Sequence, residues 1–163
     1  MSVFIFLMFA IVPLSGCAES IVENATESAI ENAMEEEGKD VDVDYSDGNF
    51  EINADGVTFQ GGEDSQWPVD FPSDVYQIEG KVLSSMSDLT QGSYWVMVQT
   101  TLSVDEAVEL YTSELKSQGW AITGTSNFSG SQTLAAEKDN RSLAIMVTST
   151  DGQTSVTITE SKL

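Results

Sequence analysis

The chain has 163 residues, a length that predicts one domain or a small domain with an appendage. Its 27 Asp and Glu residues against 6 Lys and Arg residues give a formal net charge of -21. A surface this acidic repels phosphate backbones, so the composition argues against nucleic acid as a partner. Two explanations of the acidity stay open: adaptation to high salt or solubility, and cation binding.

The sequence has no histidine, and Cys17 is its single cysteine. This composition excludes zinc sites built from His and Cys, and it excludes Ser-His-Asp and Cys-His catalysis. It also excludes a disulfide within the chain. We therefore expect a protein with no cofactor, no metal site and no catalytic residues, that is, one that is not an enzyme.

The first part of the chain has the pattern of an export signal. Residues 3–14 carry no charge and are too few to span a bilayer as a helix, which needs about 20 residues. They lead into Leu14-Ser15-Gly16-Cys17, which resembles the lipobox of prokaryotic lipoproteins. In that family a diacylglyceryl group is attached to the cysteine sulfur and the chain is cut just before it. The resemblance implies a signal peptide over residues 1–16, a lipid on Cys17, and an exported protein anchored to the cell membrane or the outer membrane.

Residues 17–67 are predicted to form an acidic helix, a small β-meander and a linker. Apolar residues at helical spacing predict the helix over residues 18–37, with glutamates in a row on another face. Residues 40–60 alternate between apolar and polar, with turn signals at Asp47-Gly48 and Asp55-Gly56. This pattern predicts a three-stranded meander with one apolar face, which we expect the helix to cover.

Residues 68–163 are predicted to form a separate α+β domain. The net charge is -14 over residues 17–67 (15 acids, one base) and -7 from residue 68 onward (12 acids, five bases). Ser103 and Glu106 form a capping-box pattern, which predicts a helix that begins there and stops at Gly119. Strands are predicted over residues 79–86, 93–102, 120–126, 132–138, 141–150 and 153–160.

The predicted fold class is therefore α+β. The signal peptide and acidic helix come first, then the small meander, and then an antiparallel sheet with one packed helix in the order β-β-α-β-β-β-β. This order of segments resembles a group of uncharacterised prokaryotic lipoproteins. The residues that carry the resemblance are Phe71-Pro72-Ser73-Asp74-Val75, Tyr111 with Leu115, and Gly119-Trp120. The resemblance implies architecture and location, and it brings no activity with it.

Three motifs invite a chemical interpretation. Asp40, Asp42, Asp44 and Asp47 could suggest calcium, but Gly48 comes one place late for an EF-hand loop and Asn53 stands where the closing Glu belongs. Ser113-Glu114-Leu115-Lys116 matches the S-x-x-K of penicillin-recognising enzymes without its partner motifs. The third is a set of aromatic residues that could line a groove: Trp67, Tyr94, Trp95, Tyr111 and Trp120. Helix and strand phase instead predicts that Tyr111 and Trp120 are core residues, and that Tyr94 and Trp95 face opposite ways.

The function predicted from these observations is a non-catalytic binding or assembly module of the cell envelope. We expect it to be held to the membrane through lipid on Cys17, with an unknown protein or small molecule as its partner. The alternative is a small carboxylate-dependent hydrolase. Two carboxyl groups about 5–9.5 Å apart in a cleft would favour the hydrolase, and a smooth sheet face with exposed aromatic residues would favour the module.

Overall fold

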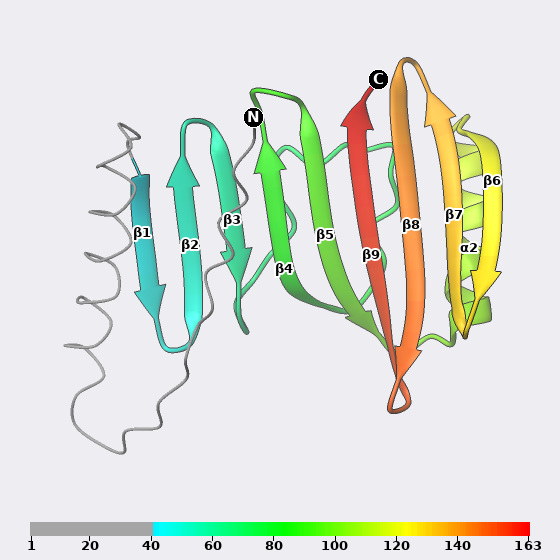
Figure 1. Cartoon of the computed structure of the whole chain (residues 1–163), viewed down its shortest axis with the longest axis horizontal. Coiled ribbons are helices and arrows are strands. Elements are labelled where there is room, and N and C mark those ends of the chain that lie inside the picture. Colours follow the sequence, from blue (N-terminus) through cyan, green and yellow to red (C-terminus); the bar gives the residue numbers. More distant parts are fainter. Residues whose placement is uncertain (1–40) are drawn as a thin grey trace.

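The computed structural model describes residues 41–163, which form an antiparallel sheet of nine strands and one helix, α2 (Figure 1). The strands are β1 (Val41–Ser46), β2 (Asn49–Ala54), β3 (Val57–Gly61), β4 (Lys81–Asp88), β5 (Ser93–Thr100), β6 (Ala121–Phe128), β7 (Ser131–Lys138), β8 (Arg141–Thr150) and β9 (Gln153–Lys162). Helix α2 spans Val104–Ser117 and lies behind the last strands of the sheet.

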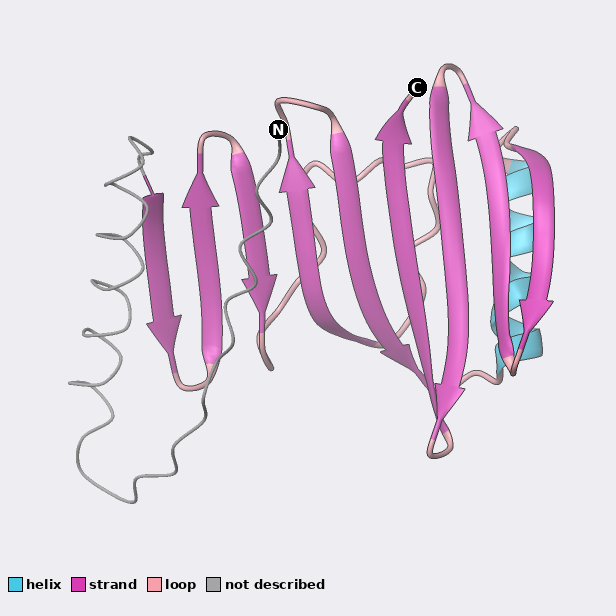
Figure 2. Cartoon of the chain, viewed as in Figure 1, coloured by secondary structure: helices cyan, strands magenta, loops and turns pink. Residues whose placement is uncertain are grey.

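The strands lie in the order β1-β2-β3-β4-β5-β9-β8-β7-β6. The chain runs through five neighbouring strands, leaves the sheet at the end of β5 to form α2, and re-enters at the far edge as β6 (Figure 2). Three hairpin connections then bring it back, so that β9 pairs with β5 from Tyr94↔Glu160 to Thr100↔Thr154. The last strand of the chain thereby joins the two halves of the sheet.

The predicted fold class is wrong, because the meander does not form a unit separate from the second sheet. Strand β3 pairs with β4 in antiparallel register from Val57↔Asp88 to Gly61↔Ser84, so all nine strands share one open, mostly β structure. The unpaired N–H and C=O groups at the edge of β3 explain this joining, since β4 satisfies them. Residues 62–80 form the connection, which passes over one face of the sheet and returns beside β3.

Tight hairpin turns account for most strand connections. Both central residues of each two-residue turn have positive φ, as the primed turns that match strand twist require. The predicted turns at Asp47-Gly48 and Asp55-Gly56 are confirmed, and Ser129-Gly130 makes a further one between β6 and β7. Asp and Asn tolerate this backbone region better than other residues with side chains, which explains their use here.

Helix α2 is delimited by local hydrogen bonds that the sequence predicted. The Ser103 hydroxyl accepts a hydrogen bond from the Glu106 N–H (3.3 Å), and the Glu106 carboxylate accepts one from the Ser103 N–H (2.9 Å). The helix ends where Gly119 adopts a φ of +84° and the Trp120 N–H donates to the Leu115 carbonyl (2.9 Å). This is a Schellman-type ending, so both helix ends have partners for their free backbone groups.

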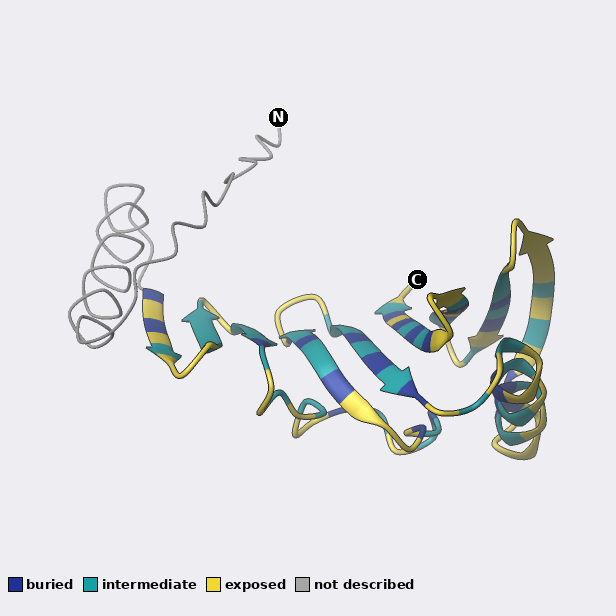
Figure 3. Cartoon of the chain, turned by 90° about the horizontal axis from the view of Figure 1, so that it is seen from below, coloured by how far each residue is buried: buried dark blue, intermediate teal, exposed yellow. Residues whose placement is uncertain are grey.

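One face of the sheet carries the hydrophobic core. Helix α2 and residues 62–80 both lie on this side, whereas no described helix or loop crosses the other side (Figure 3). We call these the covered face and the open face. The core cluster consists of Phe71, Val75, Ile78, Val82, Val96, Val98, Ala107, Tyr111, Leu115, Trp120, Leu134, Ala136, Leu143, Ile145, Val147, Val156 and Ile158. Each fully buried aliphatic or aromatic side chain contributes roughly 1.5–3 kcal/mol.

We expect a fragment that begins at Gly62 to fold without β1–β3, because every member of the core cluster lies between Phe71 and Ile158. Urea should unfold this fragment in a single cooperative transition, followed by tryptophan fluorescence and far-UV circular dichroism. As a control, Leu115→Ala in the same fragment should lower the free energy of unfolding by about 2–5 kcal/mol. A fragment that melts gradually would show instead that the meander is needed for the core.

Candidate functional site

The apolar side chains of the first five strands gather on the open face. Val43, Ile52, Phe59, Met86 and Trp95 are successive cross-strand neighbours in β1 to β5. We call this row the apolar ladder. At a strand spacing of about 4.8 Å it is roughly 20 Å across. Val43 is buried, and the other four side chains are partly exposed. Beyond β5 the same row continues with Thr159, Ala144 and Ala135, which are smaller or more polar.

On the covered face the distribution of apolar and polar side chains is reversed. The row beside the apolar ladder contains Val96, Ile158, Ile145 and Leu134 in β5, β9, β8 and β7, and all four are buried in the core. Followed toward β1, it becomes Ser85, Gln60, Glu51 and Asp44. The sheet therefore changes its apolar side between β3 and β5. The consequence is that the meander presents its apolar face away from the main core.

Trp95 lies at the point where the apolar side changes. Its neighbour Tyr94 lies on the covered face, where its ring packs edge-on against Phe71 with centroids 5.8 Å apart. Trp95 lies on the open face beside Met86 and is partly exposed.

Phe50 and Phe59 on the same face have ring centroids 5.3 Å apart, and a Cβ on Gly61 would lie 2.3 Å from the Phe50 ring. Position 61 therefore requires glycine, because the Phe50 ring occupies the space that a side chain there would need.

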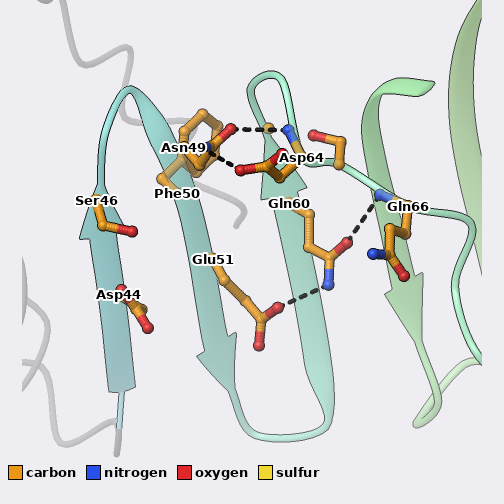
Figure 4. A pocket seen from close by; sticks show the side chains of 10 residues that line it. Asp44, Ser46, Asn49, Phe50, Glu51, Gln60, Asp64 and Gln66 are labelled. Atoms are coloured by element: carbon orange, nitrogen blue, oxygen red, sulfur yellow. Dashed lines mark hydrogen bonds between the residues drawn. The ribbon is translucent and has the colours of Figure 1, made fainter. Parts of the chain in front are cut away.

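The polar side of the meander contains a shallow, open cleft of about 380 Å³ (Figure 4). Glu51 accepts hydrogen bonds from the side-chain amides of Asn53 (2.9 Å) and Gln60 (2.6 Å). Asp64 accepts one from the Asn49 side chain (2.9 Å), whose oxygen accepts in turn from the Asp64 N–H (2.9 Å). These carboxylates therefore belong to a hydrogen-bonded amide network. Over residues 41–163, no group of three or more His, Cys, Asp or Glu side chains could hold a metal ion.

A second polar cluster fixes residues 62–80 to the sheet. Asp74 pairs with Lys138 (2.6 Å) and with Arg141 (2.5 Å), which come from β7 and β8. The Arg141 guanidinium lies 4.8 Å from the ring centroid of Trp120. The indole N–H of Trp120 donates to the Asp74 carbonyl (2.9 Å). Since Asp74 in the connection binds Lys138 and Arg141 in the sheet and Trp120 directly before β6, we interpret the cluster as a structural clamp.

Glu160 extends this clamp into the core. Its side chain is 1% exposed, and one carboxylate oxygen lies 3.7 Å from an Arg141 nitrogen with no hydrogen bond. Burial raises the pKa of Glu160, against the lowering effect of Arg141. Hydrogen bonding from Arg141, followed by that from Lys138, lowers the pKa of Asp74 to about 2. The pKa values of the two carboxyl groups thus shift in opposite directions, because Asp74 accepts hydrogen bonds from cationic donors whereas Glu160 is desolvated by burial.

The residues singled out by sequence fall in different places. Cys17, the predicted helix over residues 18–37 and Asp40 lie outside the described residues. Tyr111 and Trp120 are core residues, 0% and 3% exposed, as predicted. Ser113 and Lys116 of the S-x-x-K match are exposed on α2, and Asp42 and Asp44 lie on the polar side of the meander. None of the three motifs forms a site within residues 41–163.

The clamp was not predicted from sequence, although one signal for it was present. Glu160 follows Val156 and Ile158 at strand alternation, which assigns a carboxylate to the buried face of β9. A buried carboxylate requires a cationic or hydrogen-bonding partner. Only five basic residues follow residue 68, so the candidates were few. The polar cleft and the position of the apolar ladder had no comparable local signal.

Residues 81–159 match a family model described as START domain-like, an uncharacterised family. The match begins with β4, ends in β9, and leaves out the meander. Comparison with curated proteins gave no match, and neither did comparison with solved structures. The similarity is consistent with a binding domain without catalytic activity. Within the described part of the chain, no helix has the length and apolar character needed to cross a membrane.

We predict that Asp74→Asn removes a stabilising contribution that depends on pH. The pKa of Asp74 is lowered from 3.8 to about 2 on folding, so its contribution is present above pH 3.8 and is lost as the pH falls to about 2. The shift corresponds to about 2 kcal/mol. Urea unfolding at a series of pH values should therefore show that the variant is less stable at neutral pH and that the difference vanishes as the pH falls below about 2. Asp70→Asn, an exposed residue of the same connection, should show a much smaller difference.

Proposed function

We propose that the chain is a lipid-anchored protein of the cell envelope whose folded domain is a non-catalytic binding module. The apolar ladder on the open face is the observation that carries the binding role. Contiguous exposed apolar surface on a soluble domain usually marks an interaction site. The apolar ladder stands out on a chain with a net charge of -21, because most of its acidic surface repels other copies of the chain and other acidic proteins.

The surroundings of the apolar ladder indicate the chemistry of its partner. The open-face residues of β1–β3 are all uncharged, whereas Asp47 and Asp55 border them in the hairpin turns. An amphipathic segment with an apolar centre and basic flanks would satisfy both features, because its apolar residues lose contact with water and its charges are complementary. We therefore propose a basic amphipathic protein segment as the ligand class.

The environment of the described carboxylates supports a role without catalysis. A carboxylate hydrolase needs an acid kept protonated near neutral pH, which enzymes achieve by enclosing it in an apolar site. Glu51 and Asp64 instead lie in an open cleft and accept hydrogen bonds from side-chain amides, so neither carboxyl group is enclosed in an apolar site. Glu160 is enclosed, but its neighbours fill the space around it as part of the core. The binding role is therefore the better supported of the two.

The anchor is inferred from sequence. Cys17 follows the lipobox-like residues directly, and 23 positions, 18–40, separate it from Val41 at the start of β1. Two acyl chains on one cysteine give stable membrane attachment, at about 0.8 kcal/mol per buried CH₂. We propose that this attachment holds the binding module at the surface of the cell membrane or outer membrane.

Replacement of the lipid acceptor tests the anchor. The unaltered chain should pellet with membranes, and mass spectrometry should find an acylated Cys17 at the mature N-terminus. Cys17→Ser should leave the protein in the soluble fraction or retain residues 1–16 uncut. A Cys17→Ser variant that is cut normally and still pellets with membranes would contradict lipid attachment, and a Ser15→Ala control should behave like the original chain.

Site-directed photo-crosslinking tests the binding face. A photoreactive amino acid at Met86, on the open face, should give an adduct of higher mass in whole membranes, and its yield should fall when Trp95 is changed to Ala. The same amino acid at Thr58, on the polar side of the meander, is the matched control and should give little adduct. Adducts confined within one chain, for instance to residues 18–37, would show that the protein covers its own ladder and would contradict the binding role.

A further inference from the structure

The two edges of the sheet differ in charge. Strand β1 carries Asp42 and Asp44, whereas the other edge strand, β6, has no charged side chain. Residues 117–136, which include β6, contain no charged side chain, although the chain has 27 acidic residues. Natural sheets usually protect an edge strand with charge, proline or a bulge, because its free N–H and C=O groups can pair with another strand. By this criterion β1 is protected by its carboxylates and β6 lacks charge protection.

The second half of β6 has a regular and accessible edge. The one irregularity in its pairing with β7 falls between Ile122 and Gly124, and the residues from Gly124 to Phe128 pair regularly with Ala135 to Ser131. The side chains from Thr125 to Phe128 are all exposed, and Phe128 is 83% exposed. Threonine and phenylalanine favour strands, and the strand contains no proline. The backbone groups of this segment are therefore presented along a regularly paired part of the strand. Helix α2 packs against one face of β6, and no described strand pairs with its outer edge (Figure 1).

We infer that β6 is a self-association edge: two copies of the chain pair through antiparallel β6 strands and continue one sheet into the next. An antiparallel pairing of identical strands about a two-fold axis is self-complementary, so each residue contact occurs twice. With the axis near Thr125, the exposed Phe128 of one copy also lies near the beginning of β6 in the other. There Ala121 and Ile122 supply apolar surface.

Charge favours a second copy over an unrelated partner. Two molecules that each carry a net charge of -21 repel one another wherever their acidic surfaces approach. Contact at β6 brings together the longest uncharged segment within residues 41–163 and leaves the acidic meanders at the distal ends of the joined sheet. A basic partner would instead be drawn to the acidic surfaces. The inference does not depend on the apolar ladder, which lies on a face and stays accessible in such a dimer.

Sedimentation equilibrium of the full chain in detergent and high salt tests the association. The chain should show a monomer–dimer equilibrium, and Thr125→Asp with Asn127→Asp should weaken the dimer by at least about tenfold, since like charges oppose each other across paired strands. The matched control adds the same two charges at the exposed residues Ser149 and Thr150 of the interior strand β8, and should change the dissociation constant less than twofold. A monomer at all concentrations would overturn the inference. So would a dimer equally sensitive to both pairs of substitutions.

Disulfide trapping of the purified protein in solution locates the axis. In the Cys17→Ser chain an introduced cysteine is the only thiol, because Cys17 is the single natural one. Thr125→Cys, Ser126→Cys and Asn127→Cys should form dimers under mild oxidation with a clear maximum at one position, which identifies the residue nearest the two-fold axis. Ser149→Cys is the control. Equal trapping at all four positions, or none at the three β6 positions, would overturn the proposed pairing.

Discussion

The pairing of β3 with β4 is the interaction on which the arrangement of the molecule depends. It joins a three-strand meander to a six-strand, one-helix unit and fixes their register residue by residue. Side chains alternate strictly along each strand, so once Phe59 lies opposite Met86 every other residue of the meander is assigned to a face. A shift of one residue would bring Val43 and Ile52 to the side of the helix and turn Asp44 and Glu51 outward. The open apolar face follows from this register.

The connection between β3 and β4 is held by a different type of interaction. Residues 62–80 supply Phe71, Val75 and Ile78 to the core, and Asp74 pairs with cations on the opposite half of the sheet. A salt bridge alone contributes little at a surface, but this one is partly enclosed and is combined with a Trp120 hydrogen bond and with packing. The connection thus acts as a second cover of the core beside α2, and not as a linker between domains.

Local features of the fold could be predicted from sequence and the global arrangement could not. The capping box at Ser103 and Glu106 and the hairpin turns depend on neighbouring residues, and all are present in the structure. The α+β division was wrong because the charge change near residue 68 and the Gly-rich residues 60–65 look like a boundary. The pairing of β3 with β4, in contrast, joins residues that are 23 to 31 positions apart in the sequence, from Gly61↔Ser84 to Val57↔Asp88. The apolar face of the meander follows from local alternation and could be predicted. The side of the sheet on which this face lies, relative to α2, depends on the β3–β4 register and could not. The cationic partners of Asp74 are more than 60 residues away.

The central position of β9 has a consequence for the order in which the molecule can be assembled. This strand lies between β5 and β8, so it is the last segment in chain order and yet bridges the early and late halves of the sheet. A chain that is synthesised from its N-terminus can form the β1–β5 ribbon and later the β6–β8 ribbon. The core between them stays unsealed until residues 153–162 arrive. Long-range strand pairing of this kind is slow and leaves apolar surface exposed in the interval. The abundant carboxylates would keep such half-assembled chains apart by mutual repulsion, so the acidity of the chain is as useful to the unfinished molecule as to the finished one.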